Sequence, residues 1–322
     1  MTISIAWVRK RENFEEMFFA SDSRLSGGQN FDACPKMLGL PRQDCAIAFA
    51  GVSGDGFSMM LQLSLAIEAF TPAKTRGVEL PALRTHALKI FNAMSKRITT
   101  DIRGAEANFT DPGAAFLFGG YNWRSKSFEL WSLQFDSTTH EYVAHTGSIL
   151  CWDVQERKLV FQVDPRKEHL PIAMLAFAGD QSGAARRMLF SRLTKRIKSG
   201  ESVDRLGMEP FEVIRDLLRN PNERRPANSQ TIGGAPQLLR VSQSCQTSSF
   251  AVYWTVDGER RLHLQGRPVL PYETLNTFSI DPDDLRIQYL GYAGSSYVGL
   301  NRTLREEQDA EDAEADGPGA DG

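Results

Sequence analysis

Residues 45–70 read CAIAFAGVSGDGFSMMLQLSLAIEAF. Their first six residues form an apolar run that ends at a glycine, which is typical of a buried strand. After the turn GVSGD, apolar residues such as Met59 and Leu63 recur at helical spacing, which indicates a helix with one apolar face. Ser53 and Asp55 are both residue types that cap the start of such a helix. The chain is therefore expected to pass here from a strand, through glycines, into a helix.

Strand patterns and pairs of helices alternate on both sides of this stretch. The expected strands lie at about 3–8, 17–20, 36–39, 45–50, 114–118, 128–133, 141–150, 159–163, 172–178, 236–242, 247–256, 260–266 and 286–292, and the expected helices at about 55–70, 83–98, 181–198 and 204–219. Runs of strands separated by paired helices do not suit a doubly wound parallel sheet, which needs strict alternation. The order favours an α+β fold in which two antiparallel sheets pack together beneath outer helices. No internal repeat of roughly 20–50 residues is present, so solenoids and propellers are not expected.

The length and the charge distribution suggest one folded region and one tail. A chain of 322 residues suits one large domain or two of moderate size. Residues 306–322 hold eight acidic residues and no basic one, and removing those eight charges takes the net charge from -3 to +5. Such a segment has no apolar face to bury. We predict one domain over residues 1–300 and an acidic disordered tail over residues 301–322.

Composition excludes several classes of protein. The apolar runs fall short of the ~18 residues that span a bilayer, and charges at residues 9–12 interrupt the region where a signal peptide is apolar. The four cysteines form no CxxC pair and the five histidines no HExxH motif, so we expect no metal and no cofactor. No basic stripe interleaved with aromatic residues supports nucleic-acid binding. The sequence predicts a cytoplasmic protein with no membrane and no nucleic-acid partner.

Four features of the first 55 residues bear on function. Met1 is followed by Thr2, a residue small enough for methionine aminopeptidase to expose. The second apolar run is followed by Ser21 and Asp22, and Lys36 directly precedes the third. Gly51 lies in the strand-to-helix turn. Each has a plainer explanation taken alone, since threonine is a common second residue, lysine is usually exposed, and glycine and aspartate are frequent in turns.

Together these features resemble the N-terminal-nucleophile hydrolases of the proteasome β-subunit type, whose bacterial relatives include HslV and Anbu. The similar segments are TISIA at 2–6, ASDSRLSGG at 20–28, PKM at 35–37 and FAG at 49–51, in the family's order and near its spacing. Two later segments, FAGD at 177–180 and IGG at 232–234, resemble the family's glycine-serine-glycine turn and its late glycine pair. The resemblance covers most of residues 1–255 and is thin beyond residue 110.

The resemblance implies a fold and a set of roles. The fold is a four-layer αββα sandwich of two antiparallel sheets, and the activity is that of a threonine-type amidohydrolase, favouring a peptidase that forms an acyl-enzyme on Thr2. Lys36 would lower the pKa of the Thr2 hydroxyl, and Asp22 would hold Lys36. The backbone N–H of Gly51 would form the oxyanion hole.

This chemistry is coherent because a threonine hydroxyl needs a nearby base to become a nucleophile. Once Met1 is removed, the α-amino group of Thr2, with an unperturbed pKa of about 7.7–8.0, supplies that base on the same residue.

The chain departs from the family's pattern at the supporting residues. Asp180 stands where a serine is expected, and Ser182 is close by, so both are included in the predicted site. At two later supporting positions the alignment places Ser229 and Ile232, where the family has an aspartate and a serine.

Two other functions remain open on the sequence. One is a catalytically silent proteasome-like subunit that serves assembly or binding, which retention of Met1 would favour. The other is an unrelated binding protein whose early motifs match by chance. For the favoured function we expect peptide or unfolded-protein substrates, with a separate ATPase partner left open. We also expect a homo-oligomer, because Phe57, Leu61, Leu65 and Phe91 exceed the apolar residues that one helix stripe needs.

Overall fold

The structure is a computed structural model that describes residues 2–25, 30–100, 108–161, 168–219 and 232–291. Its helices are α1 Ser53–Ala69, α2 Thr71–Lys74, α3 Leu80–Ser95, α4 Ser182–Lys198 and α5 Glu209–Arg219. Its strands are β1 Ser4–Lys10, β2 Glu15–Ser21, β3 Met37–Gly39, β4 Cys45–Gly51, β5 Thr99–Thr100, β6 Asn108–Phe109, β7 Ala114–Asn122, β8 Ser127–Asp136, β9 Glu141–Thr146, β10 Ser148–Asp153, β11 Lys158–Val160, β12 His169–Ala178, β13 Gln237–Ser242, β14 Thr247–Val256, β15 Glu259–Leu264, β16 Arg267–Pro268, β17 Thr277–Ile280 and β18 Ile287–Leu290.

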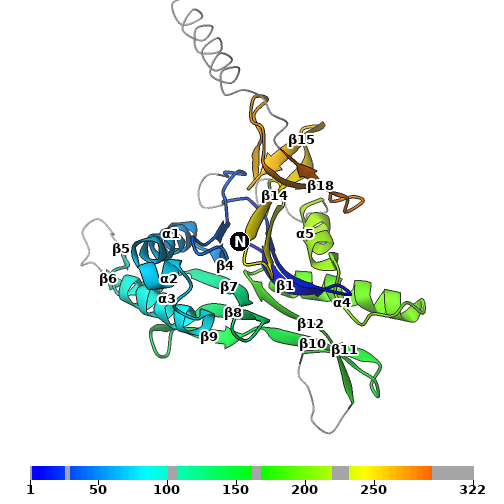
Figure 1. The fold of residues 1–322 in the computed structure, drawn as a ribbon, viewed down its shortest axis with the longest axis horizontal. Helices are drawn as coiled ribbons and strands as arrows, with labels where there is room; N and C mark the ends of the chain where they lie inside the picture. The colour runs from blue at the N-terminus through cyan, green and yellow to red at the C-terminus, as the bar shows by residue number, and fades with distance from the viewer. Residues whose placement is uncertain (1, 26–29, 101–107, 162–167, 220–231, 292–322) are drawn as a thin grey trace, which may run out of the picture.

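Two main sheets organise these strands (Figure 1). The larger sheet has 11 strands. Nine of them follow the order β11-β10-β12-β1-β2-β13-β14-β15-β16, while β17 pairs with β14 and β18 pairs with β17. The smaller sheet has five strands in the order β3-β4-β7-β8-β9. The short strands β5 and β6 pair with each other. Strand pairs in the described part are antiparallel except for β14 and β17, which run parallel.

The predicted four-layer αββα sandwich of two antiparallel sheets is wrong. Strand residues outnumber helical residues in the described part, which holds five helices, and the 11-stranded antiparallel sheet dominates the fold. The physical reason lies in the strands after residue 246. These strands, β14 to β18, join the large sheet beyond β13 and extend it to 11 strands, against five in the smaller sheet (Figure 1).

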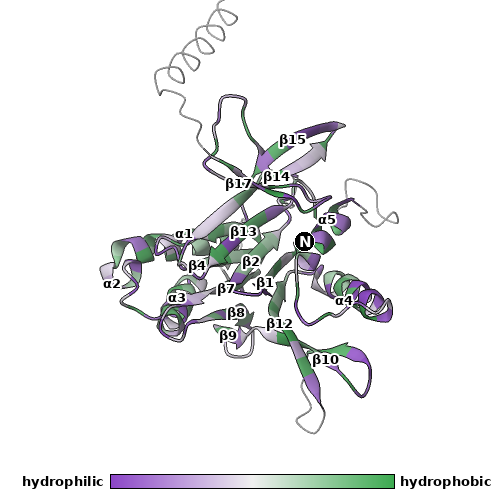
Figure 2. Cartoon of the chain, turned by 45° about the vertical axis from the view of Figure 1, so that its right-hand side comes forward, coloured by the Kyte–Doolittle hydropathy of each residue, from purple (hydrophilic) through white to green (hydrophobic). Residues whose placement is uncertain are grey.

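Three groups of buried side chains hold the elements together. Residues of α1 and α3 pack on the five-stranded sheet, with Phe91 against Phe116 at 4.6 Å between ring centroids. Residues of α4 and α5 pack on the large sheet around β1, where Trp7 stacks on Phe18. A third group, which includes Phe19 of β2 and small residues of β4, joins the two sheets. Figure 2 shows hydrophobic residues along these central strands and more hydrophilic ones on α4 and β15.

The strand-to-helix stretch folds as expected, apart from its cap. β4 ends at Gly51 and α1 begins at Ser53. The cap position is Val52, which makes no side-chain capping bond, so neither Ser53 nor Asp55 caps the helix. The carboxylate of Asp55 instead accepts a hydrogen bond from the N–H of Gly113 at 3.0 Å. This contact ties the first turn of α1 to the start of β7.

Two further predictions concern membrane-spanning helices and the C-terminal tail. In the described residues, no helix combines the length and the apolar character needed to cross a membrane. The domain boundary at residue 300 and the acidic tail of residues 301–322 lie outside the described residues.

Candidate active site

The start of β1 lies where several strand ends meet. β1 pairs with β2 on one side and with β12 on the other, so Ser4 lies opposite both Ser21 and Ala178. The hydroxyl of Ser4 also donates to the carbonyl of Phe49 in β4 at 3.0 Å, which ties β1 to the five-stranded sheet. Thr2 precedes Ser4 by two residues. It therefore lies beside the segments that follow β2, β4 and β12, which meet in the central part of the molecule (Figure 1).

A buried ion pair lies next to the Thr2 hydroxyl. Lys36 Nζ donates to Asp22 Oδ1 at 2.9 Å and lies 3.5 Å from Thr2 Oγ1. Both charged side chains have 0% of their surface exposed, and Thr2 is buried as well. An ammonium at this distance stabilises negative charge on Oγ1. The structure thus brings together the three side chains predicted as nucleophile, lysine and supporting aspartate.

The carboxylate of Asp22 is surrounded by donors. Besides Lys36, it accepts hydrogen bonds from the backbone N–H groups of Ile3 at 3.2 Å, Arg24 at 3.2 Å and Gly233 at 3.4 Å. Burial raises the pKa of the Asp22 carboxyl, while the ammonium of Lys36 and the N–H groups of Ile3 and Arg24 favour its anion. A buried carboxylate with this many partners is held in one orientation. Asp22 therefore fixes where the Lys36 ammonium lies.

The backbone of Lys36 is held by a residue that the sequence analysis missed. Gln237 is buried at the start of β13, and its Oε1 accepts the Lys36 N–H at 3.0 Å. Its Nε2 donates to the carbonyl of Cys34 at 2.6 Å. The only signal in the sequence is a polar residue at the start of the apolar strand QLLRV. Such a residue is expected inside a protein only when its amide has partners.

The backbone N–H of Gly51 lies on the edge of β4 that faces the Lys36 backbone. In β4, the N–H of Phe49 donates to the carbonyl of Lys36, while that of Val52 donates to the carbonyl of Gly113 on the opposite edge. Because N–H groups along a strand alternate between its edges, that of Gly51 lies on the edge of Lys36. Gly51 has a φ of 111°, and an added Cβ would lie 2.0 Å from the carbonyl oxygen of Gly113. Only glycine fits this turn.

The turn after β12 closes the other side of Thr2. The backbone N–H of Thr2 donates to Asp180 Oδ1 at 2.9 Å. Gly179 has a φ of 99°, and an added Cβ would lie 2.0 Å from the carbonyl oxygen of Thr2. Ser182 lies in the first turn of α4, where its hydroxyl donates to the carbonyl of Gly179. Of the two residues predicted here, Asp180 reaches Thr2, whereas the described contact of Ser182 stays within the turn.

The two late supporting positions differ in what the structure describes. Ile232 is buried in the apolar group around β1, and the next residue, Gly233, supplies a backbone N–H to Asp22. Ser229 lies outside the described residues. The first glycine of the late pair thus supports the carboxylate through its backbone N–H.

Cys34 is the nucleophilic side chain closest in sequence to Lys36, but its thiol is not activated. The side chain is buried, and burial raises the pKa of the thiol more than Lys36 lowers it. A thiol with a raised pKa is mostly protonated at neutral pH and is a poor nucleophile. Thr2 therefore remains the better candidate at this cluster.

An open cavity of about 580 Å³ adjoins Thr2. Its walls come from the end of β4, the start of β7, the end of β8 and the turn of Gly179 and Asp180. Most of the lining residues are glycine or small apolar residues, and the one charged side chain among them is that of Asp180. Thr2 thus lies in the wall of a cavity that opens to solvent.

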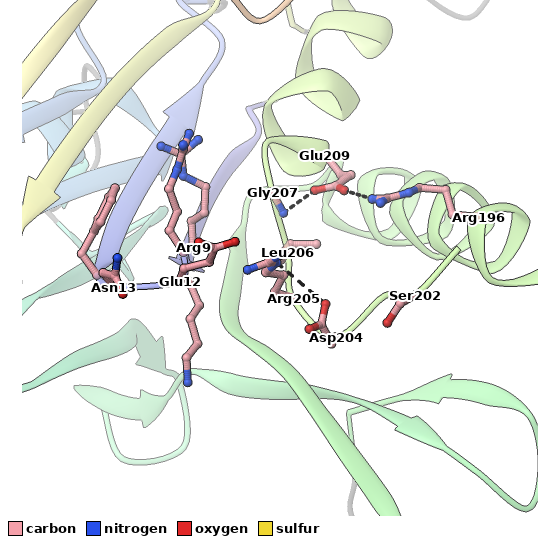
Figure 3. A pocket seen from close by; sticks show the side chains of 13 residues that line it. Arg9, Glu12, Asn13, Arg196, Ser202, Asp204, Arg205, Leu206, Gly207 and Glu209 are labelled. Carbon is pink, nitrogen blue, oxygen red and sulfur yellow. Dashed lines mark hydrogen bonds and ion pairs between the residues drawn. The ribbon is translucent and has the colours of Figure 1, made fainter. Parts of the chain in front are cut away.

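A larger cavity of about 760 Å³ lies elsewhere, between the turn after β1 and the loop before α5 (Figure 3). Four of its eight charged side chains pair with one another, and Arg9 and Lys10 pair with Glu16 and Glu15 outside the cavity lining. Arg196 pairs with Glu209, whose carboxylate also accepts the Gly207 N–H at 2.6 Å, and Arg205 lies 3.8 Å from Asp204. No nucleophile with an adjacent base is found among its described lining residues. The smaller cavity is the one lined by Thr2, whose hydroxyl lies 3.5 Å from the Lys36 ammonium.

Comparison with known proteins assigns no family or function to this chain, and the described part shows no candidate metal site. No protein-family model matches this chain, and no curated protein matches it. Within the described ranges, no group of three or more histidine, cysteine, aspartate and glutamate side chains is placed to hold a metal ion.

Proposed function

We propose that this chain is a threonine-type N-terminal-nucleophile amidohydrolase, a proteasome-like peptidase that acts through an acyl-enzyme on Thr2 after Met1 is removed. The observation that carries the proposal is the buried Lys36–Asp22 pair, at 2.9 Å, whose ammonium lies 3.5 Å from Thr2 Oγ1. The substrates would be peptides or unfolded protein segments, and the site of action the cytoplasm.

The pair is better explained by chemistry than by stability. Taking two charges out of water costs several kcal/mol per ion, and a buried pair can often be replaced by apolar residues without loss of stability, so such a pair is weak support for a structural role. Here the lysine also contacts a hydroxyl at a chain position where a free amine can arise. A lysine in that position serves to stabilise negative charge on Oγ1.

The reaction follows from the positions of these groups. The freed Thr2 amine takes the proton of Oγ1, and Oγ1 attacks the carbonyl carbon of the scissile amide. The carbonyl oxygen becomes an oxyanion, which the N–H of Gly51 stabilises by about 2.7–4 kcal/mol if it behaves like other single donors of this kind. The C–N bond then breaks, and the proton passes to the leaving amine. Water next attacks the ester carbon while the Thr2 amine takes its proton; the C–Oγ1 bond breaks, the proton returns to Oγ1, and the acyl part leaves as a carboxylic acid.

The proposal rests on the geometry of the site, because the overall fold differs from the sandwich that the resemblance implies. The Thr2 cluster is built from the starts and ends of β1, β2, β4 and β12, which lie in the central part of the molecule. The described hydrogen bonds of the Thr2, Asp22 and Lys36 side chains and backbone N–H groups involve no residue after β13.

A covalent probe tests the proposal directly. We expect the intact mass of the purified protein to correspond to a chain that begins at Thr2. A peptidyl β-lactone should then acylate Oγ1, and the adduct should map to the tryptic peptide of residues 2–9. Thr2→Ala should lose the adduct, whereas Thr2→Ser, which keeps a hydroxyl and an α-amine, should retain it. Full retention of Met1, or labelling that persists in Thr2→Ala, would contradict the proposal.

A catalytically silent subunit is the second candidate, and one observation favours it. The helix α1 exposes Phe57, Leu61 and Leu65, which is more apolar surface than a helix without a partner usually shows. If Met1 is retained, this surface would be the functional one, and the chain would serve assembly or binding.

A further inference from the structure

We infer that Asp180 is a positioning residue for the freed amine of Thr2. Its carboxylate holds the amine in place and favours the protonated form, so that the activity of the site rises as the pH increases above neutral. This inference rests on the proposed function and assigns a means of control to the same site.

The turn that carries Asp180 is held close to the Thr2 nitrogen by its backbone. The nitrogen of Thr2 lies 2.9 Å from Asp180 Oδ1, although the two residues are 178 positions apart. Gly179 brings the turn so close to Thr2 that no side chain fits between them. The hydroxyl and the N–H of Ser182 both bond to the carbonyl of Gly179, which fixes the turn from its other end. Asp180 cannot easily move away from the Thr2 nitrogen without breaking this arrangement.

The charges around Thr2 show which group acts on its nitrogen. The titratable and charged groups that face Thr2 or line its surroundings are Lys36, Asp22, Cys34, Asp180, Asp55 and Tyr142. Lys36 and Asp22 neutralise each other as a contact pair. Cys34 and Tyr142 have raised pKa values because they are buried, so both are uncharged near neutral pH. Asp55 is engaged by the N–H of Gly113.

Asp180 is therefore the uncompensated charge in contact with the Thr2 nitrogen. Among the described residues it forms no ion pair with a lysine, arginine or histidine. A carboxylate in contact with an amine stabilises the ammonium form, which cannot accept the proton of Oγ1. Because Asp180 is exposed, solvent weakens this effect. We expect it to move the titration midpoint of the Thr2 amine upward by about half a unit to one unit.

Two readouts test the inference on the full chain with a free Thr2 amine. The first is the pH profile of kcat/KM with a fluorogenic peptide amide. The second needs no activity: brief acetic anhydride labelling across the same pH range, with acetylation measured on the tryptic peptide of residues 2–9. Both are compared for the wild type, for Asp180→Asn, which keeps shape but removes charge, and for Asp55→Asn, which removes a carboxylate near the same cavity that does not touch Thr2.

The inference expects the midpoint of both curves to fall by about half a unit to one unit in Asp180→Asn and to stay unchanged in Asp55→Asn. An unchanged midpoint in Asp180→Asn, with turnover still present, would overturn it and leave the proposed function standing. Equal shifts in both variants would also overturn it, because the cause would be the general field of the cavity. A shifted labelling curve without turnover of any amide would support the role of Asp180 and reject the peptidase.

Discussion

Lys36 shows how a residue that is expected on the surface can lie fully inside. A lysine at the start of a strand is usually exposed, and its stem alone gives no sign of burial. In this chain its ammonium lies between Asp22 and Thr2, and its backbone is held by Gln237. These partners lie 14, 34 and 201 positions away, so no local pattern could have indicated all of them.

The burial of Lys36 predicts a loss of both stability and activity on substitution. Lys36→Met keeps the volume of the stem but leaves Asp22 without its cation, which should cost about 3–5 kcal/mol and lower the melting temperature. The double variant Lys36→Met with Asp22→Asn removes both charges and should recover part of that stability. Turnover of peptide amides should fall at least about 100-fold in both.

Thermal unfolding and amide turnover, measured on the same preparations, separate the two effects. Recovered stability with absent activity in the double variant would assign Lys36 to chemistry. Turnover that survives in the double variant would remove the ion pair from the mechanism.

The individual elements were largely predictable because their signals are local. The apolar run of β4 and the helical spacing of α1 lie within a few residues of their boundaries in the structure. What the pattern could not give is which sheet a strand joins. β10 and β12 follow the strands of the small sheet in the chain, yet β10 pairs with β12 and β12 with β1 in the large one. Such pairing depends on contacts between distant residues, which periodicity does not record.

The turn between β4 and α1 predicts opposite effects for two glycines. Gly51→Ala places a Cβ 2.0 Å from the carbonyl oxygen of Gly113 and forces a residue with a side chain to a φ of 111°. The backbone strain should cost about 1–3 kcal/mol of stability and, by moving the N–H of residue 51, abolish turnover.

Gly54→Ala is the matched control. Its added Cβ meets no atom within 4 Å and lies in the first turn of α1, so it should leave turnover unchanged and add about 0.5–1 kcal/mol of stability. Chemical denaturation of both variants checks these signs, and a Gly51→Ala protein as active as the wild type would exclude the oxyanion role of its N–H.

At the scale of the whole molecule, the sequence predicted four apolar residues beyond those that one helix face needs. In the structure, one of them is buried and three are exposed. Phe91, which the sequence placed among them, is fully buried against Phe116, so that part of the prediction was wrong. Phe57, Leu61 and Leu65 are 42%, 48% and 52% exposed. They follow one another at intervals of four residues, so they form one stripe along α1. Periodicity could not divide the set, because it shows which residues share a face but not which face a neighbouring element covers.

This stripe predicts self-association of the chain. α1 carries no charged residue between Asp55 and Glu68, so two copies can pair their stripes without opposing like charges. Most oligomers of identical chains have closed symmetry, and the same patch on each copy then meets itself.

Light scattering coupled to size exclusion should give a mass that is a multiple of 35.9 kDa at micromolar concentration. Leu61→Glu together with Leu65→Glu should reduce that mass to one chain, since burying two unpaired charges on each copy is unfavourable. Leu170→Glu, at a residue of equal exposure on β12, is the matched control and should leave the mass unchanged. A sharp peak at 35.9 kDa from the unaltered chain would reject the association. It would leave the Thr2 chemistry intact, because the site described above is built entirely from residues of one chain.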